Sequence, residues 1–589
     1  MSSLLAFLTD KLAAAFLAEG LDSAYGRVQI SDRPDLAQYQ CNGALGAAKA
    51  AGKPPRIIAE AIVARLQDDA DIASLSLAGP GFINIVLTDA CLLRFVTTLR
   101  TDVRDGTPVL NGGSETILLD YGGPNVAKPM HVGHLRTAII GDTLRRMLVV
   151  AGYNALGDIH LGDWGTQMGM IISELRRQHP EWVYFDADIT GPYPAQSPVT
   201  LADLEATYPT ASAACKADPD RMAEAHAATF DLQNKRPGYY ALWQHFMDVS
   251  KQAMHANFKA LNVQFDIWKG ESDVHDIIAP MVADLQAKKL AVADDGAVVI
   301  PVVTDADTKE IPPLILYKRD GAVMYGTTDL ATIVDRVQEY DPARIIYIVD
   351  LRQSLHFEQV FRAARMAGMV REDMQLIHAG NGTMNGTDGK PFKTRAGGVM
   401  KLEDLIGMAQ DKAQERIAAA HIAEGLSADE RADIARQVAV AAIKFADLQN
   451  TRSADYVFDL DRMTQFEGKT GPYLLYQTVR MRSLLEKAQN GGAGLPVTSI
   501  TDTTERDVIL ALLSWPDVFI SATRTYMPHI ICDYVYLLAQ RFSAFYAACH
   551  IMGEQDDTLR ASRLGLVQLV HRRMTHIFDL LGIECPQRM

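Results

Sequence analysis

Strand-like apolar runs alternate with amphipathic helical segments through the middle of the chain. ETILLDYGG (115–123) ends in glycines and leads into a helical pattern that starts near His131, and NALGDIHLGDWG (154–165) is followed by another helix. ARIIYIVD (343–350) and MQLIHAG (374–380) supply two further candidate strands. Strand, turn and helix in this order predict an α/β domain with a Rossmann-type, doubly wound parallel sheet.

The pattern changes on both sides of this region. Residues 1–112 contain helices and one clear strand-like run, GPGFINIVL (79–87), and predict a small N-terminal α/β module. After about residue 402 the strand signals vanish, and amphipathic segments predict a C-terminal all-α helix bundle. We therefore expect domains at 1–112, 113–402 and 403–589, with an insertion in the sheet domain at about 180–315.

Composition sets limits on this picture. A length of 589 residues fits about three domains. The six cysteines form no C-x-x-C pair, so neither a zinc clip nor a disulfide framework is indicated. The chain has no apolar stretch of about 18 residues and no export signal, so we expect a cytoplasmic protein without a membrane partner. The formal net charge of -15 does not exclude a nucleic-acid partner, because total charge does not describe local patches.

The segment from Asp120 to Asp142, DYGGPNVAKPMHVGHLRTAIIGD, is the most informative one. His131 and His134 stand where the strand gives way to the helix, so we expect both imidazoles on the first helical turn. A helix start stabilises an anionic phosphate, and Gly133 lets a nucleotide base approach the backbone. The string therefore predicts an ATP site, although H-x-x-H alone is also compatible with a helix cap, a core contact or a metal pair.

The longer string GGPNVAKPMHVGH resembles the extended HIGH signature of class I aminoacyl-tRNA synthetases, in the form of the arginyl-tRNA synthetase family. The resemblance covers essentially the whole chain, with GPGFINI, YGTTDLATIVDR, DLRQSLHF, TGPYLLYQTVRMRS and LLGIECPQRM in the expected order. It implies an arginine–tRNA ligase that uses ATP and Mg²⁺ to form arginyl-adenylate. The arginyl group then passes to the terminal adenosine of tRNA(Arg), on its 2′-hydroxyl. It also implies that arginine activation depends on bound tRNA, and we expect a monomer.

The phosphate site departs from the class pattern. In place of the second signature, K-M-S-K-S, the chain reads GTDGKPFKTRAGG (386–398), which keeps cations but lacks the serine. Family members with such a loop carry a lysine just upstream of the histidines, and Lys128 occupies that place. We expect His131, His134 and Lys128 to be catalytic and to bind ATP together with Gly133, Lys390, Lys393 and Arg395. The alternative for Lys128 is a solvated lysine in a turn.

Arginine recognition needs carboxylates that face the planar guanidinium. The resemblance implies a pocket built from Asp120, Asn125, Tyr325, Asp329 and Gln353. Without the resemblance, the alternatives are a helix N-cap for Asp329, a packing residue for Tyr325 and a surface amide for Gln353.

The outer domains supply candidate tRNA contacts. By resemblance the N-terminal module grips the outer corner of the tRNA, with Phe82 and Asn84 as base readers, and the helix bundle binds the anticodon. Tyr473, Tyr476 and Arg480 are candidates for stacking on bases, and Arg572 and Arg573 for binding phosphates. Core packing and solvated helix faces remain the alternatives.

Two other functions compete with this one. A cofactor adenylyltransferase would share H-x-G-H, but such chains are short and lack a large helical domain. A catalytically inactive tRNA-binding paralogue would explain the lost serine, whereas His131, His134, Lys128, Asn125 and Asp329 are all present.

Overall fold

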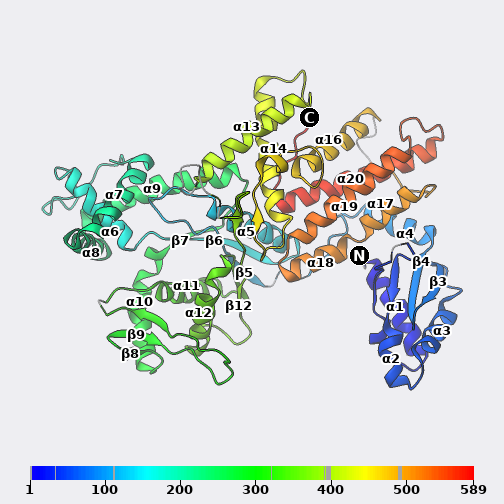
Figure 1. Ribbon diagram of the computed structural model, residues 1–589, viewed down its shortest axis with the longest axis horizontal. Coiled ribbons are helices and arrows are strands. Elements are labelled where there is room, and N and C mark those ends of the chain that lie inside the picture. The colour runs from blue at the N-terminus through cyan, green and yellow to red at the C-terminus, as the bar shows by residue number, and fades with distance from the viewer. Residues whose placement is uncertain are drawn as a thin grey trace.

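The computed structural model describes residues 3–33, 35–110, 113, 115–319, 321–390, 392, 400–488 and 494–589. Figure 1 shows the parallel sheet in the middle of the long axis, with the helices of residues 166–260 at one end. The N-terminal module and the helix bundle lie at the other end, side by side.

The N-terminal module is a four-stranded antiparallel sheet with the order β1-β2-β4-β3 and four α-helices. The sequence predicted only β4, the continuous apolar run FINIVL. The strands β1 and β2 have three residues each and are too short to show a period, and β3, IASLSLA, is interrupted by serines. The elements are α1 (Leu4–Ala18), η1 (Ser23–Gly26), β1 (Val28–Ile30), β2 (Tyr39–Cys41), α2 (Gly43–Ala51), α3 (Pro55–Leu66), β3 (Ile72–Ala78), β4 (Phe82–Leu87) and α4 (Asp89–Leu99).

The central domain contains the predicted parallel sheet, with the strand order β12-β11-β5-β6-β7. Its strands are β5 (Thr116–Asp120), β6 (Asn154–Leu161), β7 (Ile267–Gly270), β11 (Arg344–Tyr347) and β12 (Gln375–His378). The chain adds β6 and β7 on one side of β5 and later β11 and β12 on the other. The strand order therefore reverses between β5 and β11, and in doubly wound sheets ligands bind at the carboxyl ends of the strands at such a point.

The segment at about 180–315, which we expected as an insertion in the sheet domain, contains strands as well as helices. It contributes β7, the edge strand of the parallel sheet, and an antiparallel sheet of order β10-β9-β8. The remaining elements of the central domain are α5 (Gly133–Val150), α6 (Thr166–Gln178), α7 (Leu201–Ala217), α8 (Pro219–Gln233), α9 (Pro237–Ala260), α10 (Glu271–Ala287), β8 (Val292–Asp294), β9 (Ala297–Ile300), β10 (Leu314–Tyr317), α11 (Tyr325–Tyr340), η2 (Leu351–Gln353), α12 (Ser354–Met366) and β13 (Met384–Asn385).

The C-terminal part is the predicted helix bundle, apart from β14 (Tyr456–Val457), which pairs with β13. Its helices are α13 (Leu402–Ala419), α14 (Ala428–Leu448), α15 (Leu460–Met463), α16 (Gly471–Lys487), α17 (Thr503–Leu513), α18 (Trp515–Thr525), α19 (His529–Ala548) and α20 (Asp557–Leu581). The stretch Thr503–Thr525 is long and apolar enough to cross a membrane. However, it consists of the two helices α17 and α18, and more than half of its most apolar part is buried inside the structure. We interpret it as bundle core.

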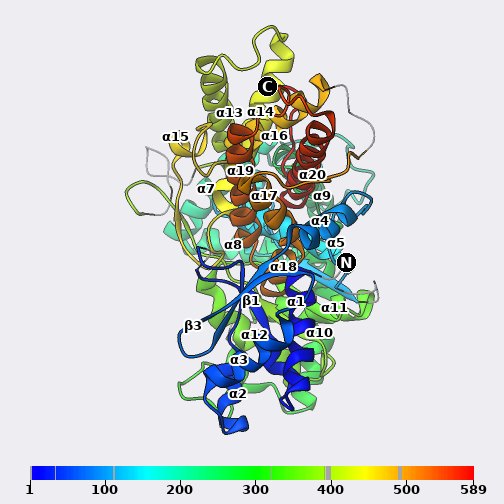
Figure 2. The ribbon, with the colours of Figure 1, turned by 90° about the vertical axis from the view of Figure 1, so that its right-hand side faces the viewer.

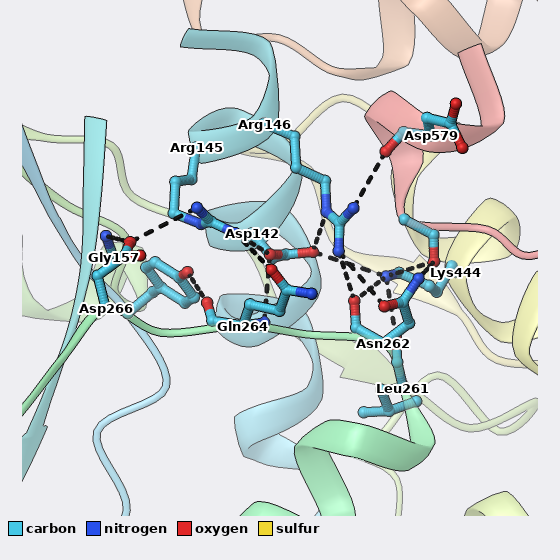
Figure 3. A network of polar contacts seen from close by, with 12 residues as sticks. Asp142, Arg145, Arg146, Gly157, Leu261, Asn262, Gln264, Asp266, Lys444 and Asp579 are labelled. Carbon is cyan, nitrogen blue, oxygen red and sulfur yellow. Dashed lines mark hydrogen bonds and ion pairs between the residues drawn. The ribbon is translucent and has the colours of Figure 1, made fainter. Parts of the chain in front are cut away.

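Two buried cations join the domains. Lys444 of α14 donates to the carbonyl oxygens of Leu261 and Gly582, 2.9 and 3.0 Å away, and its Nζ lies 3.9 Å from a carboxylate oxygen of Asp142 on α5 (Figure 3). Arg573 of α20 is fully buried and pairs with Asp105, which follows α4 in the N-terminal module. The expectation that Arg573 is a phosphate-binding cation is therefore wrong, because its guanidinium is enclosed by protein.

Candidate active site

The histidine segment lies at the carboxyl end of β5, beside the reversal of strand order. Helix α5 begins at Gly133, so His134 lies in its first turn, but His131 precedes the helix and pairs with Lys401. The backbone of Met130 and Val132 also bonds to Leu402 and Met400. The chain that leaves the basic loop at 386–398 is thus fixed next to the histidines.

The two imidazoles stack on each other, with ring centroids 4.0 Å apart. The backbone N–H of His131 donates to Nδ1 of His134, at 3.1 Å, and the N–H of Gly133 donates to Nδ1 of His131, at 3.0 Å. Burial lowers the pKa of His134 to about 3, and it also lowers the pKa of His131. Both rings are therefore neutral near pH 7 and carry their proton on Nε2, where it is free to be donated to a phosphoryl oxygen.

Gly133 is required for a reason that the sequence did not reveal. A Cβ at this position would lie 2.8 Å from Cε1 and Nδ1 of His131. The missing side chain therefore makes room for the neighbouring imidazole. Whether a nucleotide base also approaches here stays a prediction.

A cavity of about 630 Å³ lies next to this segment. Three of the expected site residues line it, namely Asn125, Lys128 and Tyr325. Asn125 is fixed by a backbone bridge to Gly162, which follows β6. Asp120, His131, His134, Asp329 and Gln353 are not among its lining residues.

Lys128 has a defined position in the wall of this cavity. Its Nζ lies 4.3 Å from the ring centroid of Tyr208 on α7, in a cation–π contact. This contact differs from the alternative of a solvated lysine in a turn. Within the described residues, no carboxylate lies at ion-pair distance from this ammonium group, so its charge is available to an anion.

The carboxylate of Asp329 bonds to an imidazole that sequence reasoning missed. Nε2 of His356 lies 2.5 Å from a carboxylate oxygen of Asp329, and this hydrogen bond raises the pKa of His356. Asp329 is the fifth residue of α11 and not its N-cap, which is Met324. Gln353 lies one turn before His356, at the exposed end of η2.

Glu271 is a second missed residue. It lines the cavity at the start of α10, and burial, followed by the negative charge of Asp163, raises the pKa of its carboxyl to about 7. The charge of Asp329 contributes in the same direction, which indicates that these carboxylates share one region of the protein. An acid at a helix start normally indicates only a favourable dipole contact, so no local pattern distinguishes Glu271 as a site residue.

Asp120 ends β5 and is held by a buried arginine. Nη2 of Arg336 donates to a carboxylate oxygen of Asp120, at 2.5 Å. Arg336 also bonds to Asp158 of β6. Of the loop cations, Lys390 is exposed, whereas Lys393 and Arg395 lie outside the described residues.

The candidate tRNA contacts lie in two different domains. Asn84 is buried in its sheet, where its side-chain oxygen accepts from Gln40, and Phe82 is half-buried. Tyr473 packs edge-on against Tyr536. The other two candidates of the bundle are Tyr476, which is exposed, and Arg480, whose guanidinium lies 4.0 Å from the ring centroid of Tyr546.

A doubly wound parallel sheet with H-x-G-H at the start of its first helix, followed by a large helical domain, is typical of a class I aminoacyl-tRNA synthetase. The comparisons with known proteins narrow this class. The family model for the catalytic domain of class I (R) tRNA synthetases matches residues 100–460. The models for the arginyl tRNA synthetase N terminal domain and the DALR anticodon binding domain match residues 3–87 and 474–589. The chain belongs to the arginyl-tRNA synthetase family and is thus an aminoacyl-tRNA ligase.

Individual relatives agree with this assignment. The chain is similar to the arginine–tRNA ligases of Hyphomonas neptunium, at 49% identity, and of Maricaulis maris, at 46%, over the full length of both chains in each case. In fold it resembles the arginyl-tRNA synthetases of Plasmodium falciparum, with a TM-score of 0.80 at 24% identity, and of Thermus thermophilus, with 0.78 at 22%. Each of these comparisons covers both chains completely.

Proposed function

We propose that this chain activates L-arginine with ATP and transfers it to the terminal adenosine of tRNA(Arg) for protein synthesis. The observation that carries the proposal is the pair of neutral, stacked imidazoles at the start of α5, next to a cavity with a partly buried carboxyl group. In the first step an oxygen of the arginine carboxylate attacks the α-phosphorus of ATP, and the bond to pyrophosphate breaks. In the second step the tRNA 2′-hydroxyl attacks the adenylate carbonyl, and AMP leaves.

His131, His134 and Lys128 are proposed to stabilise the charge that develops on the phosphates. The imidazoles donate from Nε2, and Lys128 supplies a full positive charge from the cavity wall. Positioning and charge stabilisation are sufficient for phosphate chemistry of this kind. Lys390, Lys393 and Arg395 are proposed as further phosphate contacts, and Gly133 as the place where the nucleotide approaches the backbone.

The proposed arginine site combines carboxylates with polar neighbours. Glu271 in the cavity, together with Asp329 and Asp120, is proposed to supply negative charge for the guanidinium. Asn125, Tyr325 and Gln353 are proposed to complete the site.

Mg²⁺ is proposed to arrive with ATP. Within the described ranges, no three His, Cys, Asp or Glu side chains come together as a metal site. Mg²⁺ usually binds substrate phosphates with one or two carboxylates and waters, so the triphosphate fits it better than a cage of protein side chains. When bound, it neutralises phosphate charge.

The remaining proposals concern tRNA and the state of the protein. Phe82 and Asn84 in the module at 1–112, and Tyr473, Tyr476 and Arg480 in the bundle at 403–589, are proposed to contact tRNA. We further propose that the protein is a cytoplasmic monomer and that arginine activation depends on bound tRNA. Pyrophosphate exchange measured with and without tRNA tests that dependence, and robust exchange without tRNA would contradict it.

The test of the whole proposal is charging of total tRNA with each labelled amino acid in turn. We expect arginine alone to be attached, and His134→Ala to abolish the reaction while tRNA binding is retained. Retained tRNA binding without charging by the unaltered protein would support the inactive paralogue.

A further inference from the structure

Arg336 is a buried cation that lies behind the proposed arginine site. It comes from α11 and is 1% exposed. Its Nε donates to Asp158, at 2.8 Å, and its Nη2 to Asp120, at 2.5 Å, while the guanidinium carbon lies 5.4 Å from the ring centroid of Tyr347. These three partners are paired in register on the adjacent strands β6, β5 and β11. One side chain thus spans the carboxyl end of the sheet where the strand order reverses.

The same face of α11 carries two residues of the proposed site. Tyr325 and Asp329 precede Arg336 by eleven and seven residues, and these spacings are close to three and two helical turns. The contacts of Arg336 with the sheet therefore fix the rotation of the helix that presents Tyr325 and Asp329.

The charges around Arg336 do not cancel. Asp120 and Asp158 pair with a single guanidinium, so the three ionised groups carry one net negative charge. Asp158 is enclosed, while the side chain of Asp120 retains 15% exposure. The surplus negative charge is therefore accessible only through Asp120, where a substrate cation is expected.

The cluster also retains unused hydrogen-bonding capacity. Oδ1 of Asp158 is buried and has no hydrogen-bond partner within the described part of the chain. Buried polar atoms of a purely structural bridge are normally satisfied. This is a second indication that the cluster is arranged for more than stability.

We propose that Arg336 is a positioning residue for arginine selection. It neutralises Asp158 and holds Asp120 as a carboxylate directed at the substrate guanidinium. The inference rests on the proposed role of Asp120 in arginine binding. Without Arg336, two neighbouring carboxylates would repel each other, and the enclosed one would take up a proton or displace Asp120.

The experiment is tRNA-supported ATP–pyrophosphate exchange, with KM measured separately for arginine and for ATP. We expect Arg336→Met to raise KM for arginine about tenfold to a hundredfold, the range for loss of a hydrogen bond to a charged group. KM for ATP should change by less than about threefold. Arg336→Lys, which keeps the charge but not the planar fork, should give an intermediate value. Equal rises in both KM values, or an unchanged KM for arginine, would overturn the proposal.

A charge-restoring variant separates this role from a structural one. Asp158→Asn in the Arg336→Met background removes the second carboxylate and restores a net charge of one, so KM for arginine should recover by at least about threefold. Inhibition by citrulline, the uncharged isostere of arginine, should be equal in all variants. Absence of the recovery contradicts the proposed charge balance.

Separate control measurements distinguish a loss of folding from a loss of function. Melting temperature and tRNA binding are measured for every variant, and if Arg336→Met does not fold, the KM split of Arg336→Lys decides. If the unaltered protein shows no arginine-dependent exchange, the proposed function fails. If it shows exchange and the Arg336 variants match it in KM for arginine, only the role of Arg336 fails.

Discussion

Two buried cations of this molecule, Lys444 and Arg336, differ in how completely the polar groups around them are satisfied. Lys444 reaches backbone carbonyl oxygens from two other segments of the chain as well as the carboxylate of Asp142, as Figure 3 shows. Arg336 bonds to two carboxylates, and one of them, Asp158, retains a buried oxygen without a hydrogen-bond partner among the described residues. Both residues join elements distant in sequence, but only Arg336 lies at the reversal of strand order.

The difference distinguishes a structural contact between domains from a ligand-binding site. Carbonyl oxygens are fixed by the backbone, and a Cβ on Gly582 would lie 2.4 Å from Nζ of Lys444, so this site has no room for a ligand. Asp120 and Asp329, in contrast, are side chains whose charges are only partly compensated by Arg336 and His356. A fully satisfied cation holds domains together, whereas a partly satisfied cluster can respond to a substrate.

The largest expected effect is on stability, through the contacts of Lys444. Lys444→Met leaves two carbonyl groups buried without their donor, while Asp142 keeps its bond from Arg146. An unsatisfied buried polar group costs about 1–3 kcal/mol. We expect a clear fall in the free energy of unfolding, measured in urea, while the folded enzyme keeps its KM for arginine. A raised KM for arginine at unchanged stability would contradict a purely structural role for Lys444.

A change in the cavity should affect KM for arginine and leave stability nearly unchanged. Glu271→Gln removes a carboxylate proposed to pair with the guanidinium, so KM for arginine should rise by about tenfold or more with little change in stability. The matched control is Glu403→Gln, an exposed acid of α13 outside this cavity. Equal kinetics of the two variants would remove Glu271 from the site.

The pH dependence of arginine binding follows from the same carboxyl group. Burial raises the pKa of Glu271 to about 7, so the group is largely protonated at about pH 6 and ionised at about pH 8. The ionised form attracts the guanidinium, and KM for arginine should therefore fall as the pH rises across this interval. Glu271→Gln should flatten this part of the profile. A KM that rises with pH in the unaltered enzyme would have the wrong sign.

A subtler change addresses the packing around Lys444. Gly582 has a φ of +63°, and an added Cβ would meet the ammonium group. Gly582→Ala should lower stability by about 1–2 kcal/mol through backbone strain and crowding. Gly425→Ala is the control, since it has a positive φ but open space around its Cβ. A similar loss in both variants would show that only the backbone angle matters.

The smallest expected effect concerns His356. Its hydrogen bond with Asp329 raises the pKa of the imidazole, so the protonated ring competes with substrate for the carboxylate at low pH. His356→Asn should change KM for arginine by about threefold or less at about pH 8, and lower it more clearly at about pH 6. Titration of this histidine by NMR gives an independent check, because a pKa below the usual value would contradict the hydrogen bond.

The sequence predicted the parts that depend on local pattern. The strands at 116–120 and 344–347 follow from continuous apolar runs, and the histidine segment follows from its position between a strand and a helix. The start of α5 was misplaced by two residues, because backbone pairing with residues 400–402 holds His131 outside the helix.

The remaining parts depend on long-range contacts that no local pattern encodes. Arg336 meets Asp120 across 216 positions of the chain, and in the sequence it is one more cation on a helix. Arg573 looked like a phosphate ligand because its spacing does not reveal that Asp105 covers it. Glu271 escaped notice because its burial arises from packing against residues of another segment.

The most direct test of the account is a crystal structure of the protein with arginine and a non-hydrolysable ATP analogue. We expect the guanidinium at hydrogen-bond distance from the carboxylates of Glu271, Asp329 and Asp120, with Asp120 still bound to Arg336. The arginine carboxylate should face the α-phosphate beside His131 and His134. A guanidinium bound away from these carboxylates would contradict the central claim that this incompletely neutralised set of charges selects arginine.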